Sequence, residues 1–143
     1  MLKKEFQASF DSLHEILTLV AVQARECGFQ DSHLSRLELA VEEAIVNIIH
    51  YANLPKTATI KVSIGSTAQK QSLKVIIEDS GLPFNPIIHG KIFNPSEEVN
   101  PDELGGYGIY FILVIMDCVE YKRENGFNIM TLTKHVKESP PLL

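Results

Sequence analysis

The sequence predicts an α+β protein, a two-layer α/β sandwich with a mixed, mostly antiparallel sheet and helices on one face. Three observations support this prediction. Two early stretches repeat apolar residues at helical spacing, and several later stretches alternate apolar with polar residues. Residues 125–126 are Asn-Gly, the dipeptide favoured where two antiparallel strands turn back on each other. The expected order is strand, helix, helix, strand, strand, loop, helix, strand and strand.

The first half of the chain contains one strand and two helices. Residues 3–9 can form a short edge strand. A helix capped by Asp11 or Ser12 follows and is expected to end at the Cys-Gly pair of residues 27–28. A longer helix is expected over residues 33–52, ending before a proline that cannot continue it.

The second half contains four strands and one short helix. The strands are expected at residues 58–64, 73–77, 119–123 and 127–134. The helix is the apolar run at residues 109–116. Residues 81–106 have no periodicity and are rich in proline and acidic side chains. An irregular segment of this length inside a compact domain is typical of a functional loop such as a lid.

Composition indicates one globular domain. The chain has 143 residues, of which 45% are hydrophobic and 22% charged. We expect an ordered domain over residues 1–137 and a flexible tail at residues 138–143. A net charge of -5 without a basic stripe argues against direct nucleic-acid binding. No apolar run approaches the ~20 residues that span a bilayer, and no signal peptide is visible, so a cytoplasmic protein without membrane contact is expected.

Cysteine and histidine spacing gives no case for a disulfide framework or a transition-metal site. Cys27 and Cys118 lie far apart and form no CxxC pair. The five histidines are scattered without HExxH spacing. A magnesium ion bound together with a nucleotide is a separate possibility, because oxygen ligands suffice for it.

A polar stripe on the long helix is the first part of a candidate site. Glu43, Asn47 and His50 gather on the side opposite the apolar residues. A carboxylate and a carboxamide one turn apart can orient a hydroxyl or water and hold a hard cation. Glu42 points about a quarter turn away from Asn47 and is assigned to the surface. The alternative is that the whole stripe is simply the solvated face of the helix.

Two glycine-containing turns supply the other parts. Residues 79–83, Asp-Ser-Gly-Leu-Pro, come directly after an apolar strand, although a plain strand-ending turn would have the same composition. Glycines at positions 105, 106 and 108 precede the short helix, where backbone amides can face phosphate oxygens without an intervening side chain. Each turn alone is weak. With the polar stripe, and in this order, they predict a magnesium–nucleotide site.

Residues 43–52, 79–86 and 105–110 resemble the N, G1 and G2 boxes of the GHKL, or histidine-kinase-like, ATPase superfamily. Within it, the chain is similar to the bacterial anti-sigma-factor serine/threonine-protein kinases, from about Phe6 to Lys134. The resemblance implies the Bergerat fold and the cofactors ATP and Mg²⁺. It also implies phosphorylation of a STAS-type anti-anti-sigma protein, sequestration of a sigma factor, and a homodimer.

The resemblance also implies roles for individual residues. Glu43 would be the general base and Asn47 the ligand of Mg²⁺. Asp79 would accept a hydrogen bond from the exocyclic amine of adenine, and Thr131 would contact adenine directly or through water. An ordinary strand residue is an equally good interpretation of Thr131. The other nucleotide-contacting residues would be His50, Gly81, Pro83, Gly105, Gly106, Tyr107 and Gly108.

A second class of function stays open from sequence. No lysine or arginine occurs from Ile92 to Tyr121, and Lys91 is the nearest basic residue before that stretch. Related kinases often bring a basic lid residue to the phosphates, where it stabilises the transferring group. The alternative is therefore a nucleotide-responsive module that switches partners without phosphotransfer.

Overall fold

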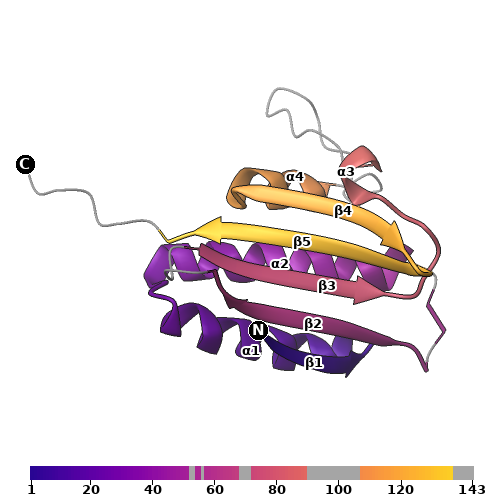
Figure 1. The fold of residues 1–143 in the computed structure, drawn as a ribbon, viewed down its shortest axis with the longest axis horizontal. Coiled ribbons are helices and arrows are strands. Elements are labelled where there is room, and N and C mark those ends of the chain that lie inside the picture. The colour runs from indigo at the N-terminus through magenta and orange to yellow at the C-terminus, as the bar shows by residue number, and fades with distance from the viewer. Residues whose placement is uncertain (52–53, 56, 68–71, 90–106, 137–143) are drawn as a thin grey trace, which may run out of the picture.

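Five strands form one layer of the structure, and the main helices lie together on one face of that sheet (Figure 1). This computed structural model describes residues 1–51, 54–55, 57–67, 72–89 and 107–136. The elements are β1 (Leu2–Gln7), η1 (Phe10–Ser12), α1 (Leu13–Glu26), α2 (Asp31–Tyr51), β2 (Thr59–Ser66), β3 (Ser72–Asp79), α3 (Pro86–His89), α4 (Tyr107–Ile115), β4 (Cys118–Glu124) and β5 (Phe127–His135). The predicted two-layer α+β sandwich is confirmed.

The strands lie in the order β1-β2-β3-β5-β4 (Figure 1). All four neighbouring pairs are antiparallel, so the described sheet contains no parallel pair, whereas the sequence predicts a mixed sheet. The insertion of β5 explains the difference. β3 and β4 run in the same direction, but β5 lies between them and is antiparallel to both.

The turn between β4 and β5 has the conformation that its sequence predicts. Asn125 and Gly126 both have positive φ, 51° and 83°. A two-residue hairpin with positive φ at both central positions matches the twist of the strands it joins. The turn fixes the β4–β5 register, with Glu124 opposite Phe127.

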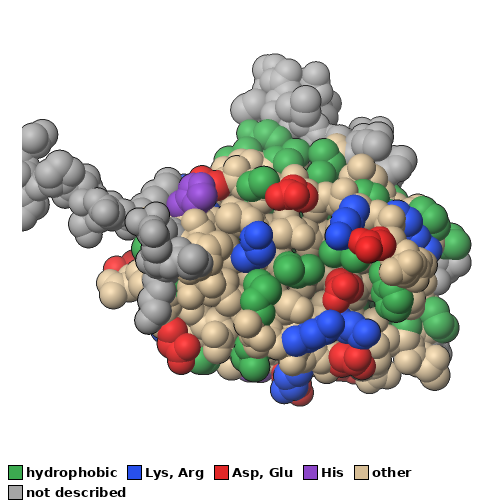
Figure 2. Space-filling view, in the orientation of Figure 1, with side chains coloured by type: hydrophobic (Ala, Val, Ile, Leu, Met, Phe, Trp, Pro, Cys, Tyr) green, Lys and Arg blue, Asp and Glu red, His purple; other side chains and the backbone are tan. Residues whose placement is uncertain are grey.

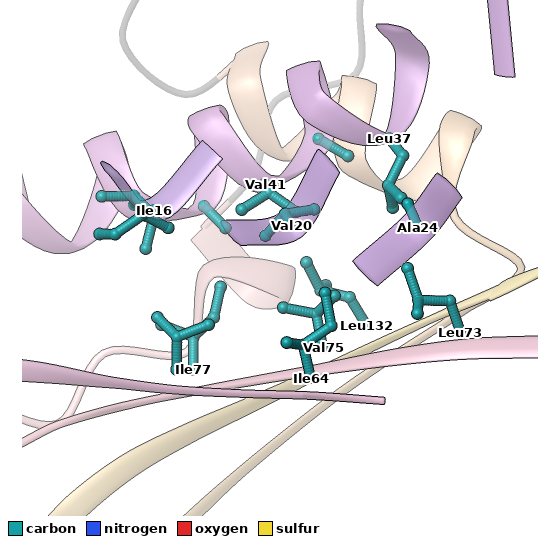
Figure 3. Packing of buried hydrophobic residues seen from close by; sticks show 14 of the residues in the cluster. Ile16, Val20, Ala24, Leu37, Val41, Ile64, Leu73, Val75, Ile77 and Leu132 are labelled. Carbon is teal, nitrogen blue, oxygen red and sulfur yellow. The ribbon is translucent and has the colours of Figure 1, made fainter. Parts of the chain in front are cut away.

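The core lies between the sheet and helices α1 and α2 (Figure 3). Every second residue of β2, β3 and β5 points toward the helices, as the period of a strand requires. The helices contribute residues at three- and four-residue spacing. The side chains labelled in Figure 3 are Ile16, Val20, Ala24, Leu37, Val41, Ile64, Leu73, Val75, Ile77 and Leu132.

Most differences from the expected elements are at their ends. The long helix begins at Asp31, two residues earlier than expected, and α4 begins at Tyr107 rather than residue 109. The expected irregular segment contains the short helix α3, and its residues 90–106 lie outside the described part of the chain, as does the expected tail.

Helix α4 is the most apolar helix. It buries Ile109 and Ile112 but leaves Phe111, Leu113 and Val114 substantially exposed. It has nine residues, and no helix in the described ranges is both long and apolar enough to cross a membrane.

Candidate nucleotide-binding site

A narrow hollow lies between α2, the end of β3 and the β4–β5 hairpin. Its walls are mainly apolar. The lining residues are Ala44, Asn47, Ile48, Ile77, Asp79, Phe84, Pro86, Tyr121, Asn128 and Met130. Two residues that the sequence singles out, Asn47 on the long helix and Asp79 at a strand end, therefore share one site although 32 positions separate them.

Asn47 is only 9% exposed, so it does not belong to a solvated helix face. Its carboxamide forms no hydrogen bond with the residues that the structure describes. Helix α4 packs along α2, and its Gly108 lies against Glu43, one turn before Asn47. A buried carboxamide in a hollow offers a neutral oxygen ligand or a hydrogen-bonding group to whatever occupies that space.

Glu43 lies one turn before Asn47 and against the first turn of α4. A Cβ atom placed on Gly108 would be 3.2 Å from Cδ of Glu43 and would overlap its Oε2. The close approach therefore depends on the missing side chain of this glycine. Burial, and secondarily the charge of Glu42, raises the pKa of the Glu43 carboxyl above its usual range.

Asp79 is the most deeply buried charged residue of the site, with 3% exposure. Its Oδ1 accepts hydrogen bonds from the Gly81 amide at 2.9 Å and from Asn128 Nδ2 at 3.0 Å. Burial raises the pKa of Asp79, and the bonds from Asn128 and Gly81 and the charge of Arg123 oppose the rise without cancelling it. Oδ2 takes part in neither bond.

Sequence reasoning missed three residues of the hairpin that build this end of the site. Asn128 lies opposite Asp79 in the β3–β5 register. The Tyr121 hydroxyl donates to Asn128 Oδ1 at 2.5 Å, and Arg123 Nη1 donates to the Gly81 carbonyl at 2.6 Å. One signal was available in the sequence: Asn128 occupies an inward position of an alternating strand, where a polar side chain needs partners.

The structure does not place Thr131 in the hollow. Thr131 is three residues from Asn128, so it points to the opposite face of the sheet. There it lines a shallow depression together with Lys74 and Glu120. That open face carries interspersed lysine, arginine and acidic side chains (Figure 2). Thr131 is therefore not placed to contact a base in the hollow, contrary to the expectation from sequence. Its position fits the alternative interpretation, an ordinary strand residue.

Two further residues expected to contact the nucleotide, His50 and Pro83, do not line the hollow. His50 is exposed, and its ring is 5.6 Å from the Phe10 ring, centroid to centroid. Pro83 is exposed too, and neither residue lines the hollow. Instead Phe84 lines it and stacks on Tyr51 at 5.4 Å, which joins the turn after β3 to the end of α2.

The structure describes only part of the glycine segment at the start of α4. Gly108 and the backbone of Tyr107 belong to the first turn of that helix. Gly105, Gly106 and the basic candidate Lys91 lie outside the described residues. Gly81 is buried, and its amide binds Asp79.

The sandwich and the hollow between a Glu/Asn helix and a strand-end aspartate together define a class of protein. The family described as Histidine kinase-like ATPase domain matches residues 6–134, so the chain belongs to it, and ATP use follows from that membership. A narrower group is defined by the Serine-protein kinase RsbW of Oceanobacillus iheyensis. It is 30% identical over 128 residues, covering 85% of this chain and 77% of that protein. The chain accordingly belongs with these serine/threonine-protein kinases, and the resemblance seen in the sequence is confirmed.

Two solved structures share the fold. The RsbU and RsbW domains of a Mycobacterium tuberculosis protein superpose with a TM-score of 0.63 at 9% identity, covering 100% of this chain and 35% of that one. The SiaB-SiaC complex from Pseudomonas aeruginosa gives a TM-score of 0.60 at 14% identity, covering 95% of this chain and 90% of the matched chain. At these identities the likeness concerns the fold alone.

Proposed function

We propose that this chain transfers the γ-phosphoryl group of ATP to a serine or threonine of a STAS-type anti-anti-sigma protein, and that it binds a sigma factor when that antagonist is not engaged. The observation that carries the proposal is the convergence of Asn47 and Asp79 on one hollow, with Glu43 one turn away. The kinase relatives support the protein substrate. The SiaB-SiaC complex supports a protein partner for this fold.

Adenine would occupy the apolar part of the hollow. Ile77 and Met130 would contact the faces of the base, and Asp79 would accept a hydrogen bond from its exocyclic amine. Gly81 and Pro83 would shape the turn that carries this aspartate. Since Oδ1 is already bonded, Oδ2 is the atom assigned to this role.

The phosphates would lie toward Asn47 and the first turn of α4. The described residues contain no group of three or more His, Cys, Asp or Glu side chains that could hold a metal. Mg²⁺ commonly needs only one or two protein ligands in addition to substrate phosphates, so the Asn47 carboxamide fits it. Mg²⁺ would neutralise phosphate charge. Amides of the segment from Gly105 through Gly108 would bind phosphate oxygens, and His50 would act from the rim.

Glu43 would serve as the general base. In the transfer, the hydroxyl oxygen of the substrate bonds to the γ-phosphorus, the bond from that phosphorus to the β-bridging oxygen breaks, and the hydroxyl proton passes to Glu43. The raised pKa of Glu43 suits this role, because a base works best when its pKa approaches the working pH.

One observation favours the second candidate, a partner-switching module without phosphotransfer. Among the described residues, neither lysine nor arginine lines the hollow. A site without a cation stabilises the transferring phosphoryl group less well. Both candidates bind nucleotide and partner, so only transfer of phosphate separates them.

Phosphate transfer is tested by incubating the chain with Mg-ATP and its cognate STAS-type protein and locating phosphoserine or phosphothreonine by mass spectrometry. We expect phosphate with the wild type, loss of it with Glu43→Gln, and retention with Glu38→Gln, a matched change on the same helix. A partner left unmodified by the wild type would favour the binding module. Sedimentation would test the proposed homodimer, and co-purification with and without the antagonist would test sigma-factor binding.

A further inference from the structure

We propose that Asn128 is the positioning residue that holds Asp79 as a hydrogen-bond acceptor toward the hollow, and that it thereby sets the preference for adenine over guanine. This inference rests on the proposed nucleotide-binding function and deepens it. It assigns to the β4–β5 hairpin a part in base selection, although the side chain that reads the base belongs to β3.

The Asn128 amide has a complete set of hydrogen bonds and is only 5% exposed. Nδ2 donates to Asp79 Oδ1 at 3.0 Å and to the Leu82 carbonyl at 2.9 Å. Oδ1 accepts from the Phe84 amide at 3.3 Å and from the Tyr121 hydroxyl at 2.5 Å. Two donors and two acceptor sites are all that a carboxamide offers, so no capacity is left over.

Two of these partners cannot exchange roles. The Leu82 carbonyl can only accept a hydrogen bond, and the Phe84 amide can only donate one. Rotating the Asn128 amide by half a turn would therefore place its oxygen against the Leu82 carbonyl, acceptor to acceptor, and its NH₂ group against the Phe84 amide, donor to donor. The backbone of the turn after β3 thus fixes which end of Asn128 faces Asp79.

The fixed orientation determines how Asp79 presents itself. Asp79 Oδ1 receives N–H groups from both Gly81 and Asn128, so it is saturated as an acceptor. The remaining oxygen, Oδ2, can only accept hydrogen bonds when the carboxyl group is ionised. Adenine presents an amine there, whereas guanine presents a carbonyl oxygen, and two facing acceptors repel each other.

The protonation state of Asp79 links Asn128 to the choice of base. Among the described residues, two charged or titratable side chains lie near this carboxyl. The positive charge of Arg123 lowers the pKa of Asp79, and Tyr121 lines the same hollow. The lining residues from α2 and β5 are neutral. Burial raises the pKa of Asp79 and the bond from Asn128 lowers it. Without the bond from Asn128, the Asp79 carboxyl retains its proton more readily. A protonated Asp79 oxygen can donate a hydrogen bond to the carbonyl oxygen of guanine.

The experiment compares Asn128→Leu with Asn85→Leu. The second variant is the matched control: the same change in the turn after β3, at a side chain that accepts a bond from Ile87 and does not line the hollow. ADP and GDP are titrated calorimetrically into each purified chain at several pH values. We expect Asn128→Leu to reduce the preference for ADP over GDP by about tenfold, the value of one lost charge-assisted bond. The pH below which ADP affinity falls should move upward.

The result that would overturn the inference is an equal weakening of ADP and GDP with an unshifted pH profile, because that describes a merely structural asparagine. An unchanged preference would overturn it as well. If Asn128→Leu does not fold, Tyr121→Phe removes one bond of the same amide and should reduce the preference by about threefold. A wild type that binds neither nucleotide would overturn the proposed function and this inference together, whereas the variant outcomes concern the inference alone.

Discussion

Gly108 lies directly against the carboxyl group of Glu43, although 65 positions separate the two residues in the chain. The first turn of α4 therefore acts as one wall around the proposed base, and the fit leaves no room for a methyl group. Any side chain at this position must displace the carboxylate, since the rest of α2 is held by its buried face.

Gly108→Ala should reduce phosphotransfer by about ten- to a hundredfold, because a displaced base loses its alignment with the hydroxyl. Alanine ordinarily stabilises a helix by about 0.5–1 kcal/mol relative to glycine. Helix propensity alone therefore predicts no loss of stability in Gly108→Ala, and the loss of activity is attributed to the displaced carboxylate. Single-turnover phosphorylation of the partner measures the effect. Val114→Ala, at a position that is 64% exposed on the same helix, is the control. Unchanged transfer by Gly108→Ala would show that the carboxylate is not needed where it lies.

The rate of phosphotransfer should fall on acidification through the raised pKa of Glu43, because only the ionised carboxylate accepts a proton. Glu42→Gln removes one of the two causes of the rise, and burial remains. The acid limb of the pH profile of kcat/KM should therefore move to lower pH in Glu42→Gln. Glu38→Gln, at a residue that does not act on Glu43, should leave the limb in place. An acid limb that is the same in all three proteins would argue against Glu43 as the base.

Asp117→Asn should destabilise the fold by about 1–3 kcal/mol, because it leaves the buried ammonium of Lys134 without a counter-charge. Lys134 is 9% exposed at its side chain, and its Nζ lies 3.5 Å from Asp117 Oδ2. Burial alone would raise the pKa of Asp117, but the His135 amide and the Lys134 charge outweigh it, and the pKa is lowered. A carboxyl whose pKa is lower in the folded state than in the unfolded state stabilises the fold at pH values above its unfolded pKa. This stabilisation is lost as the pH falls through its folded-state pKa. The difference between wild type and Asp117→Asn in urea unfolding should accordingly be largest near neutral pH and shrink in acid.

An exposed ion pair provides the comparison. Lys122 and Glu124 approach to 2.8 Å, closer than the buried pair, yet both side chains are more than half exposed. Lys122→Gln should leave the urea concentration at the midpoint of unfolding unchanged, because solvent screens such pairs. If this variant were as destabilised as Asp117→Asn, distance rather than burial would control the two pairs.

Ser9→Ala should leave the fold as stable as before, or stabilise it by up to about 1 kcal/mol. The Ser9 hydroxyl is buried without a hydrogen-bond partner among the residues that the structure describes. Removing it discards a desolvated polar group and leaves the backbone bond from the Ser9 amide to Gln7 intact. Thermal unfolding measures the change, and a loss above about 1 kcal/mol would mean that the hydroxyl is satisfied in solution.

Local patterns predicted the elements well because each depends on neighbouring residues. The spacing of apolar residues in the long helix and the Asn125-Gly126 turn are signals of this kind. Motif order predicted that Asn47 and Asp79 share a site, and both residues line the same hollow because both lie on well-defined elements. The sheet order is different: the insertion of β5 between β3 and β4 depends on long-range packing, and no local signal encodes it.

The errors at the adenine end follow from that missing pairing. Without the β3–β5 register, nothing identifies Asn128 as the residue opposite Asp79. Thr131 was an attractive candidate by type, but three positions along a strand reverse the face on which a side chain lies. The inward pattern of Asn128, Met130 and Leu132 would have identified the correct face.

The position of β5 has a consequence for synthesis on the ribosome. A chain emerges in order, and domains generally fold once their elements are available. Strand β3 is finished at Asp79, but its neighbour in the sheet arrives about fifty residues later with Asn128. Until then the inner edge of β3 is unpaired and the carboxyl of Asp79 lacks the donor from β5. A nascent chain that has reached only β4 should therefore be unable to bind nucleotide, and its exposed strand edge should make it a substrate for chaperones.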